Sequence, residues 1–158
     1  ITPKRENGDR LDTLTTDQSI WAEVLQVNLL APALLTRRLT KSLQKGQGAV
    51  VNVTSIAGTR VHRFAGPAYA ASKAALSTLT RELASDLGNL GIRVNAVSPG
   101  EIKTEMLSLA TANEMIHDIP LHRLGDVEEV ASAIYFLCCG SASYINGAEI
   151  EINGGQHV

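Results

Sequence analysis

A tyrosine and a lysine four residues apart could carry out acid–base chemistry in this chain. Tyr69 and Lys73 stand in the segment YAASK, and on a helix this spacing places both side chains on one face, one turn apart. A free phenol has a pKa of about 10, which is too high for proton transfer at neutral pH. An ammonium ~4 Å away contributes ~4 kcal/mol at an effective dielectric constant of about 20, enough to lower that pKa by about three units. We therefore predict that Tyr69 acts as a general acid or base and that Lys73 tunes it.

Ser55 could complete this site from the preceding segment. If its hydroxyl folds back beside the phenol, the two groups could hold a substrate oxygen between them. The Tyr–Lys spacing alone is a weak signal, because three tyrosines and five lysines in 158 residues produce such a pair by chance in roughly one chain of ten. The alternative interpretation is a partly exposed helix with a solvated lysine. The elements that surround this segment distinguish the catalytic interpretation from this one.

Length and composition indicate one soluble globular domain over residues 1–158. The chain is 44% hydrophobic and 19% charged, and its net charge is −2. This charge gives no reason to expect nucleic acid or an anionic membrane as a partner, and no apolar run approaches the ~20 residues that span a bilayer. The start of the chain does not resemble a signal peptide.

Cysteine and histidine usage points to a reducing compartment and to no metal. Cys138 and Cys139 are adjacent in an apolar helical pattern, which predicts buried free thiols in a cytoplasmic protein. No spacing is typical of metal ligands. Four scattered histidines are predicted to be surface or loop residues: His62, His117, His122 and His157.

The first part of the chain predicts a loop followed by a long helix. Residues 1–16 are polar and read as a loop, and a helix over 17–45 follows, with Thr16 as its N-cap. Asn28 falls on its buried face, in register with Trp21 and Val24. Pro32 has no N–H, so it frees the backbone carbonyl of Asn28. That carbonyl could hold an ordered water, or the proline could produce only a tolerated kink.

The middle of the chain predicts a parallel strand–helix–strand unit. Residues 49–55 and 92–100 read as buried strands, and 67–88 as the helix that joins them in a right-handed crossover. Ligands bind beyond the carboxyl ends of such strands, where Ser55 and the Pro99-Gly100 turn both lie. The start of the helix that carries Tyr69 is expected on the same side.

The last third predicts a lid, a helix and an edge strand. Residues 101–125 have weak periodicity, and a connection of this length often covers a substrate. Asp126 and Glu129 predict a capping box at the next helix. In residues 148–152, Glu149 and Glu151 alternate with apolar residues, which indicates an edge strand with one polar face. The lid contributes apolar residues that could line a pocket or simply pack: Met106, Leu107, Leu109, Met115 and Ile116.

Six segments in order resemble the short-chain dehydrogenase/reductase family. They are VNLLAP, VVNVTSIAG, YAASKAAL, IRVNAVSPGEIKT, RLGDVEEVA and the terminal INGG. The resemblance implies a doubly wound, Rossmann-like α/β fold and hydride transfer between NAD or NADP and an alcohol or carbonyl substrate. It assigns catalytic roles to Asn28, Ser55, Tyr69 and Lys73, with Asn28 holding a water in a proton relay. Tyr69 and Lys73, together with Pro99, Gly100, Ile102 and Thr104, are implied to bind the cofactor.

The first half of the family pattern is absent from these 158 residues. No strand with a Gly-rich turn for the pyrophosphate opens the chain, and the residue that selects NAD or NADP is missing with it. We therefore expect a partial domain, the second half of the family fold, with an exposed apolar sheet edge and weak dinucleotide binding. The family dimerises, often on the way to tetramers, through the helices that correspond to 17–45 and 67–88. The alternative hypothesis is a non-catalytic, self-associating module.

Overall fold

Three parallel strands form the sheet of this protein. The computed structural model describes residues 1–5, 8–104 and 115–158, and within them the strand order is β1-β2-β3. The strands are β1 (Ala49–Val53), β2 (Arg93–Pro99) and β3 (Glu149–Ile152). The predicted strands 49–55 and 92–100 are therefore confirmed with shorter ends, and 148–152 is an edge strand as expected.

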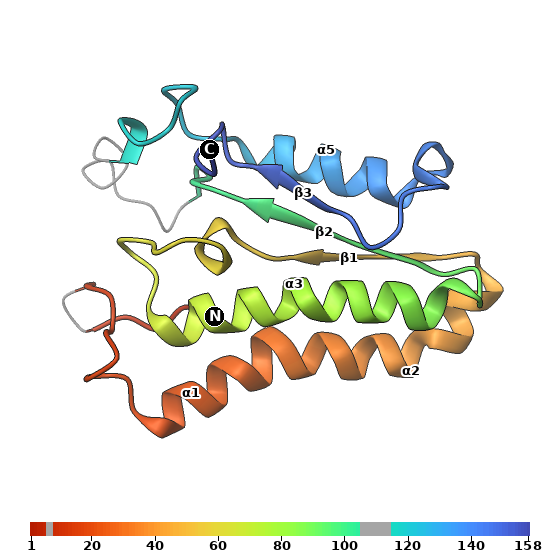
Figure 1. Ribbon diagram of the computed structural model, residues 1–158, viewed down its shortest axis with the longest axis horizontal. Helices are drawn as coiled ribbons and strands as arrows, with labels where there is room; N and C mark the ends of the chain where they lie inside the picture. Colours follow the sequence, from red (N-terminus) through yellow and green to blue (C-terminus); the bar gives the residue numbers. More distant parts are fainter. Residues whose placement is uncertain (6–7, 105–114) are drawn as a thin grey trace.

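Helices cover both sides of this sheet, as a doubly wound fold requires (Figure 1). The helix α3 packs against β2 on the side where the first helices also lie, and α5 lies on the opposite side. The helices are α1 (Gln18–Leu25), α2 (Ala31–Lys45), α3 (Pro67–Gly88) and α5 (Val127–Cys138). Two short 3₁₀ turns complete the described elements, Ile56–Gly58 and Gly140–Ala142. The bounds of α3 match the sequence prediction, and the capping box of Asp126 and Glu129 is present.

The predicted helix 17–45 is interrupted by a π-helical turn over Gln26–Leu30. Asn28 lies inside this turn and is buried. Pro32, four residues later, cannot donate the α-helical hydrogen bond to Asn28, and π-turns are frequent where the ladder is disturbed near functional sites. The N-cap is Asp17 and not the expected Thr16, because the Thr16 hydroxyl donates to the backbone carbonyl of Asp12 instead.

The stretch Gln18–Lys45 also corrects the expectation that no segment could span a bilayer. Its 28 helical residues contain a window of mean hydropathy 1.3, and by length and composition alone it could cross a membrane. Such a finding is weak, because core helices pass the same test. In this structure Val24 and Asn28 of this stretch are buried, and α1 packs against α3.

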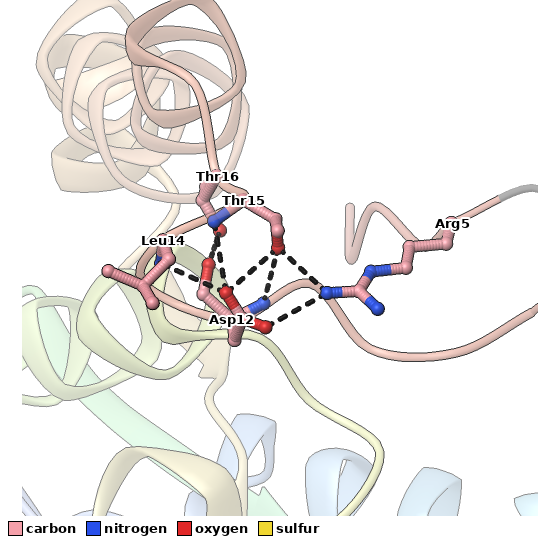
Figure 2. A network of polar contacts seen from close by, with 5 residues as sticks. All are labelled: Arg5, Asp12, Leu14, Thr15 and Thr16. Carbon is pink, nitrogen blue, oxygen red and sulfur yellow. Dashed lines mark hydrogen bonds and ion pairs between the residues drawn. The ribbon is translucent and has the colours of Figure 1, made fainter.

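The loop that precedes α1 is ordered around the carboxylate of Asp12 (Figure 2). Asp12 Oδ1 accepts from the backbone N–H groups of Leu14 and Thr15, both at 2.9 Å, and Oδ2 accepts from Arg5 at 2.9 Å. The Thr15 hydroxyl, with further help from these groups, holds the pKa of Asp12 below its usual range. The described residues of the predicted loop 1–16 contain no helix or strand beyond a bridge between Lys4 and Arg10.

A compact core lies where α3 faces β2. Ala84, Ile92 and Val94 are buried, and five partly buried residues pack against them: Leu43, Val50, Leu83, Leu87 and Leu90. Since Ile92 is fully buried, Ile92→Ala is expected to lower the free energy of unfolding by about 2–5 kcal/mol. Urea unfolding of the full-length protein would measure this. Leu14→Ala, at a position that is 96% exposed, is the control and should change it by less than ~0.5 kcal/mol.

Several apolar residues predicted to be buried are exposed. On α5, Val127 and Ala131 are exposed, and on α2, Leu35 and Leu39 are exposed. Val53 is 43% exposed because β1, predicted to be buried on both faces, lies at the edge of the described sheet. Cys138 is exposed and Cys139 half-buried, so these free thiols are not the buried pair that we expected. In each case no described element of the chain covers the residue.

Candidate active site

The 3₁₀ turn after β1 carries Ser55 to the edge of the sheet. Ser55 is the N-cap of this turn, and its Oγ accepts a hydrogen bond from Ala57 N at 3.2 Å. The turn then passes very close to α3. A Cβ on Gly58 would stand 2.8 Å from Ala74 N and 3.0 Å from Lys73 C, so this contact requires glycine.

The phenol of Tyr69 lies beside the Ser55 hydroxyl. Burial raises the pKa of Tyr69, a hydrogen bond with the Ser55 side chain opposes this rise, and the negative charge of Glu101 adds to it. Tyr69 is partly buried in the first turns of α3. The structure thus brings together the two hydroxyl groups that the sequence analysis selected.

Lys73 takes a different position from the one we expected. Its Nζ donates to the backbone carbonyl of Val53 at 2.7 Å and stands 5.6 Å from the centroid of the Tyr69 ring. Burial lowers the pKa of Lys73. In this arrangement the ammonium is directed at a carbonyl oxygen, and burial is the main cause that raises the pKa of Tyr69. The tuning of Tyr69 by Lys73 stays a prediction.

Asn28 is connected to the Tyr69 turn through a buried serine. Its Nδ2 donates to Ser72 Oγ at 3.0 Å and to the carbonyl of Ile1 at 2.9 Å. Ser72 Oγ in turn donates to the carbonyl of Tyr69 at 2.7 Å. Asn28 therefore braces the start of α3 from the π-turn, and its role in holding a water stays a prediction.

A cavity of about 990 Å³ opens in front of Ser55 and Tyr69. Gly100, Ile102 and Thr104 also line it, whereas Lys73 and Pro99 do not. Among the apolar residues expected in the lid, Met115 lines the cavity, and Ile116 is half-buried nearby in sequence. Met106, Leu107 and Leu109 lie outside the described residues, so the predicted lid over 101–125 stays a prediction.

A contact between a histidine and a carboxylate in the wall of this cavity was not expected from the sequence. His62 Nε2 and Glu101 Oε1 are 2.5 Å apart, and the two side chains are 17% and 11% exposed. Arg10 Nη1 donates to the carbonyl of His62 at 3.0 Å, which fixes the loop from the other side. His62 lies in a loop, as predicted, but this histidine is half-buried and is held against Glu101. Its position between Ser55 and Tyr69 was the available signal, because that loop must border the site.

Glu101 gives a testable electrostatic effect on Tyr69. Because its charge raises the pKa of Tyr69, Glu101→Gln is expected to lower this pKa. A catalytic step that needs the phenolate would then reach half of its maximal rate at a lower pH. The pH dependence of kcat in the full-length protein measures the shift. Glu101→Asp keeps the charge and should shift the profile less; an unchanged profile in Glu101→Gln would contradict the electrostatic role.

The fold and the site together define a class. The protein has parallel strands with helices on both faces, and its polar site lies at the carboxyl ends of the strands. This is the arrangement of doubly wound α/β domains, which bind their ligands at that edge.

Comparisons with known proteins identify the family within this class. A family profile described as Enoyl-(Acyl carrier protein) reductase matches residues 4–157. Protein FixR of Bradyrhizobium diazoefficiens is 54% identical over 158 residues, covering 100% of this chain and 57% of its own length. Galactitol 2-dehydrogenase (L-tagatose-forming) of Cereibacter sphaeroides is 38% identical over 93% of this chain and 61% of its own length. The chain belongs to the short-chain dehydrogenase/reductase family of oxidoreductases.

Solved structures agree with this assignment. A 3-oxoacyl-[acyl-carrier protein] reductase from Brucella melitensis with bound NAD superposes with a TM-score of 0.93 at 32% identity, over 100% of this chain and 59% of its own. The expected partial family fold is therefore confirmed. The chain spans about three fifths of the length of the relatives that it matches.

Proposed function

We propose that the full-length protein is an NAD(P)-dependent oxidoreductase acting on an alcohol or carbonyl substrate, with Tyr69 as its acid/base. The observation that carries this proposal is the placement of Ser55 and Tyr69 together in the wall of one cavity, where the Ser55 hydroxyl opposes the rise in the pKa of Tyr69. Two hydroxyls held together in this way can bind one substrate oxygen. A scaffold protein would have no need of this arrangement together with Lys73 and Asn28.

In this proposal the residues of this chain manage the proton and the position of the substrate. Ser55 Oγ holds the substrate oxygen, and Tyr69 Oη gives it a proton during reduction or removes one during oxidation. Asn28, through Ser72, keeps the first turns of α3 in place. The nicotinamide, when bound, supplies or accepts the hydride at the reacting carbon.

The residues at the end of β2 fit the nicotinamide half of such a cofactor. Gly100, Ile102 and Thr104 line the cavity beside Tyr69, and Gly100 packs so closely on the turn after β3 that a Cβ would stand 2.6 Å from Asn153 Cβ. We propose that these residues, with Pro99, Tyr69 and Lys73, hold NAD or NADP.

Titration of the full-length protein with NAD and with NADP, followed by turnover assays, tests the proposal. The substrate panel should contain a polyol and a 3-oxoacyl thioester, because related proteins are named for each. Binding of one dinucleotide and hydride transfer to or from one panel member would support the proposal. Failure to bind either dinucleotide would contradict it.

Exposed apolar residues on the first helices favour self-association of the protein. Five of them lie from the π-helical turn to the middle of α2, and each is more than 40% exposed: Val27, Leu30, Leu34, Leu35 and Leu39. We propose that the helices spanning 17–45 and 67–88 form a homodimer or homotetramer interface in a cytoplasmic protein that binds neither nucleic acid nor membrane. Light scattering of Leu35→Lys against the wild type would test this interface. A mass unchanged by the substitution would contradict it.

A further inference from the structure

A carboxylate from the edge strand β3 lies between the sheet and α3. Residues paired in parallel register share a face of the sheet, and Glu149 pairs with Ala96, which pairs with Asn52. Asn52 Nδ2 donates to Thr80 of α3, so this is the face that α3 covers. Glu149 and Glu151 thus share one polar face of the edge strand, as predicted, and this face is the one turned toward α3.

The path of Glu149 across the sheet depends on the small residue next to it. Ala96 is fully buried, and its methyl group leaves room for the Glu149 side chain to pass β2. The carboxylate then meets two hydroxyls from different elements. Oε1 accepts from Thr54 Oγ1 and Oε2 accepts from Ser77 Oγ.

Both partners of this carboxylate are next to predicted catalytic residues. Thr54 directly precedes Ser55, and Ser77 follows Lys73 by one helical turn on α3. Glu149 therefore joins the strand end that carries Ser55 to the helix that carries Tyr69 and Lys73. The distance between the Ser55 and Tyr69 hydroxyls depends on how these two elements are held.

Hydroxyl groups surround the carboxylate of Glu149. Thr54 Oγ1 lies within hydrogen-bond distance of Glu149 Oε1 and of the Val97 carbonyl at 2.9 Å. Ser77 donates to Glu149 and accepts from Arg81 Nη1 at 3.1 Å, which places a positive charge at the far end of the chain of hydrogen bonds.

A charged side chain at this place has a cost that an apolar strand residue would avoid. Removing a carboxylate from water is unfavourable unless it is well hydrogen-bonded, and replacing buried polar groups by apolar ones of similar size is often neutral or stabilising. Charge-assisted hydrogen bonds are, however, stronger and more directional than neutral ones. We propose that Glu149 is a positioning residue that holds Ser55 against Tyr69 through Thr54 and Ser77. This inference rests on the proposed acid/base role of Tyr69.

The pKa of Tyr69 distinguishes two roles of Glu149: positioning Ser55 beside Tyr69, or only stabilising the fold. The Ser55 hydrogen bond lowers the pKa of Tyr69, so releasing Ser55 should raise this pKa and move the pH profile to higher pH. Lys73 on α3 and Glu101 from a facing loop lie near Tyr69. His62 contacts Glu101, and further charged residues line the same cavity: Lys4, Arg5, Asp9, Arg10, Asp12 and Arg63. None of them is altered by a substitution at Glu149, and the pH shift is opposite to the one expected for Glu101→Gln.

The experiment compares Glu149→Val, Glu149→Gln and the control Glu151→Gln in the full-length protein. Glu151, two residues along β3, accepts from Asn153 and, among the described residues, makes no hydrogen bond with Thr54 or Ser77. We expect Glu149→Val to lower kcat by about 10- to 100-fold with the dinucleotide Kd unchanged, and to raise the Tyr69 pKa. Glu149→Gln, which can still accept one hydroxyl, should fall between Glu149→Val and wild type, and Glu151→Gln should match wild type.

A second readout keeps this inference separate from the proposed function. The difference in phenolate absorbance between each variant and the same variant with Tyr69→Phe gives the pKa of Tyr69 without any turnover. A raised pKa of Tyr69 in Glu149→Val supports the positioning role of Glu149 even if no substrate of the panel reacts. In that case only the proposed oxidoreductase reaction is contradicted. A Tyr69 pKa and kcat equal to wild type, with lowered thermal stability alone, would overturn the inference while leaving the proposed function intact.

Discussion

Tyr69→Phe is expected to lower kcat of the full-length protein by about 10²- to 10⁴-fold, the range that general acid–base catalysis contributes. The substitution removes only the hydroxyl that lies beside Ser55 and keeps the aromatic ring in the first turns of α3. Because the cofactor contacts proposed for Gly100, Ile102 and Thr104 are untouched, the dinucleotide Kd should stay within a few-fold of wild type. Steady-state kinetics and cofactor titration on the same preparation measure both quantities.

An exposed tyrosine provides the matched control for this result. Tyr135 on α5 is 72% exposed, and Tyr135→Phe should leave kcat, KM and Kd at wild-type values. If Tyr69→Phe weakened cofactor binding as much as it slowed turnover, the acid/base role would be wrong and Tyr69 would be a binding residue.

Gly58→Ala is expected to impair both stability and turnover. The new Cβ would stand 2.8 Å from Ala74 N and 3.0 Å from Lys73 C, and these main-chain atoms of α3 cannot move without moving the helix. Overpacking of this kind costs about 1–3 kcal/mol. The turn and the helix carry Ser55 and Tyr69, so a displacement near 1 Å should also cost about 10²-fold in kcat. Urea unfolding and kinetics on one preparation give both values.

A second glycine separates this steric effect from the general cost of losing a glycine. Gly140 starts a 3₁₀ turn beyond α5, and a Cβ there would meet no heavy atom within 4 Å. Gly140→Ala should therefore change stability by less than ~0.5 kcal/mol and leave kcat unaltered. Equal changes of stability and of kcat in Gly58→Ala and Gly140→Ala would show that the close approach of Gly58 to α3 affects neither quantity.

The local patterns of the sequence predicted most elements well. Proline at the first position of α3, the capping box of Asp126 and Glu129, and the β-branched run of β1 are all signals that depend on neighbours in the chain. The predictions that failed concern burial. Cys138 was expected inside from its apolar helical pattern, and it is exposed because periodicity marks an apolar face without showing what covers it.

The direction of individual side chains could not be predicted in the same way. Lys73 Nζ donates to the Val53 carbonyl, a partner that the Tyr–Lys spacing does not indicate. His62 lies in a loop as predicted, but its contact with Glu101, 39 positions away, was not expected. Both outcomes depend on which groups two separate loops bring within hydrogen-bond distance.

The sequence by itself determined the family, the parallel strand–helix–strand order, and the choice of Ser55 and Tyr69 as residues at one sheet edge. These conclusions follow from spacing along the chain and from the rule that parallel strands end at the same side. Only the tertiary structure decided that Glu149 turns under β2 toward Thr54 and Ser77. That contact depends on the register Ala96↔Glu149 and on the small size of Ala96, and register is a relation between strands that no single segment contains.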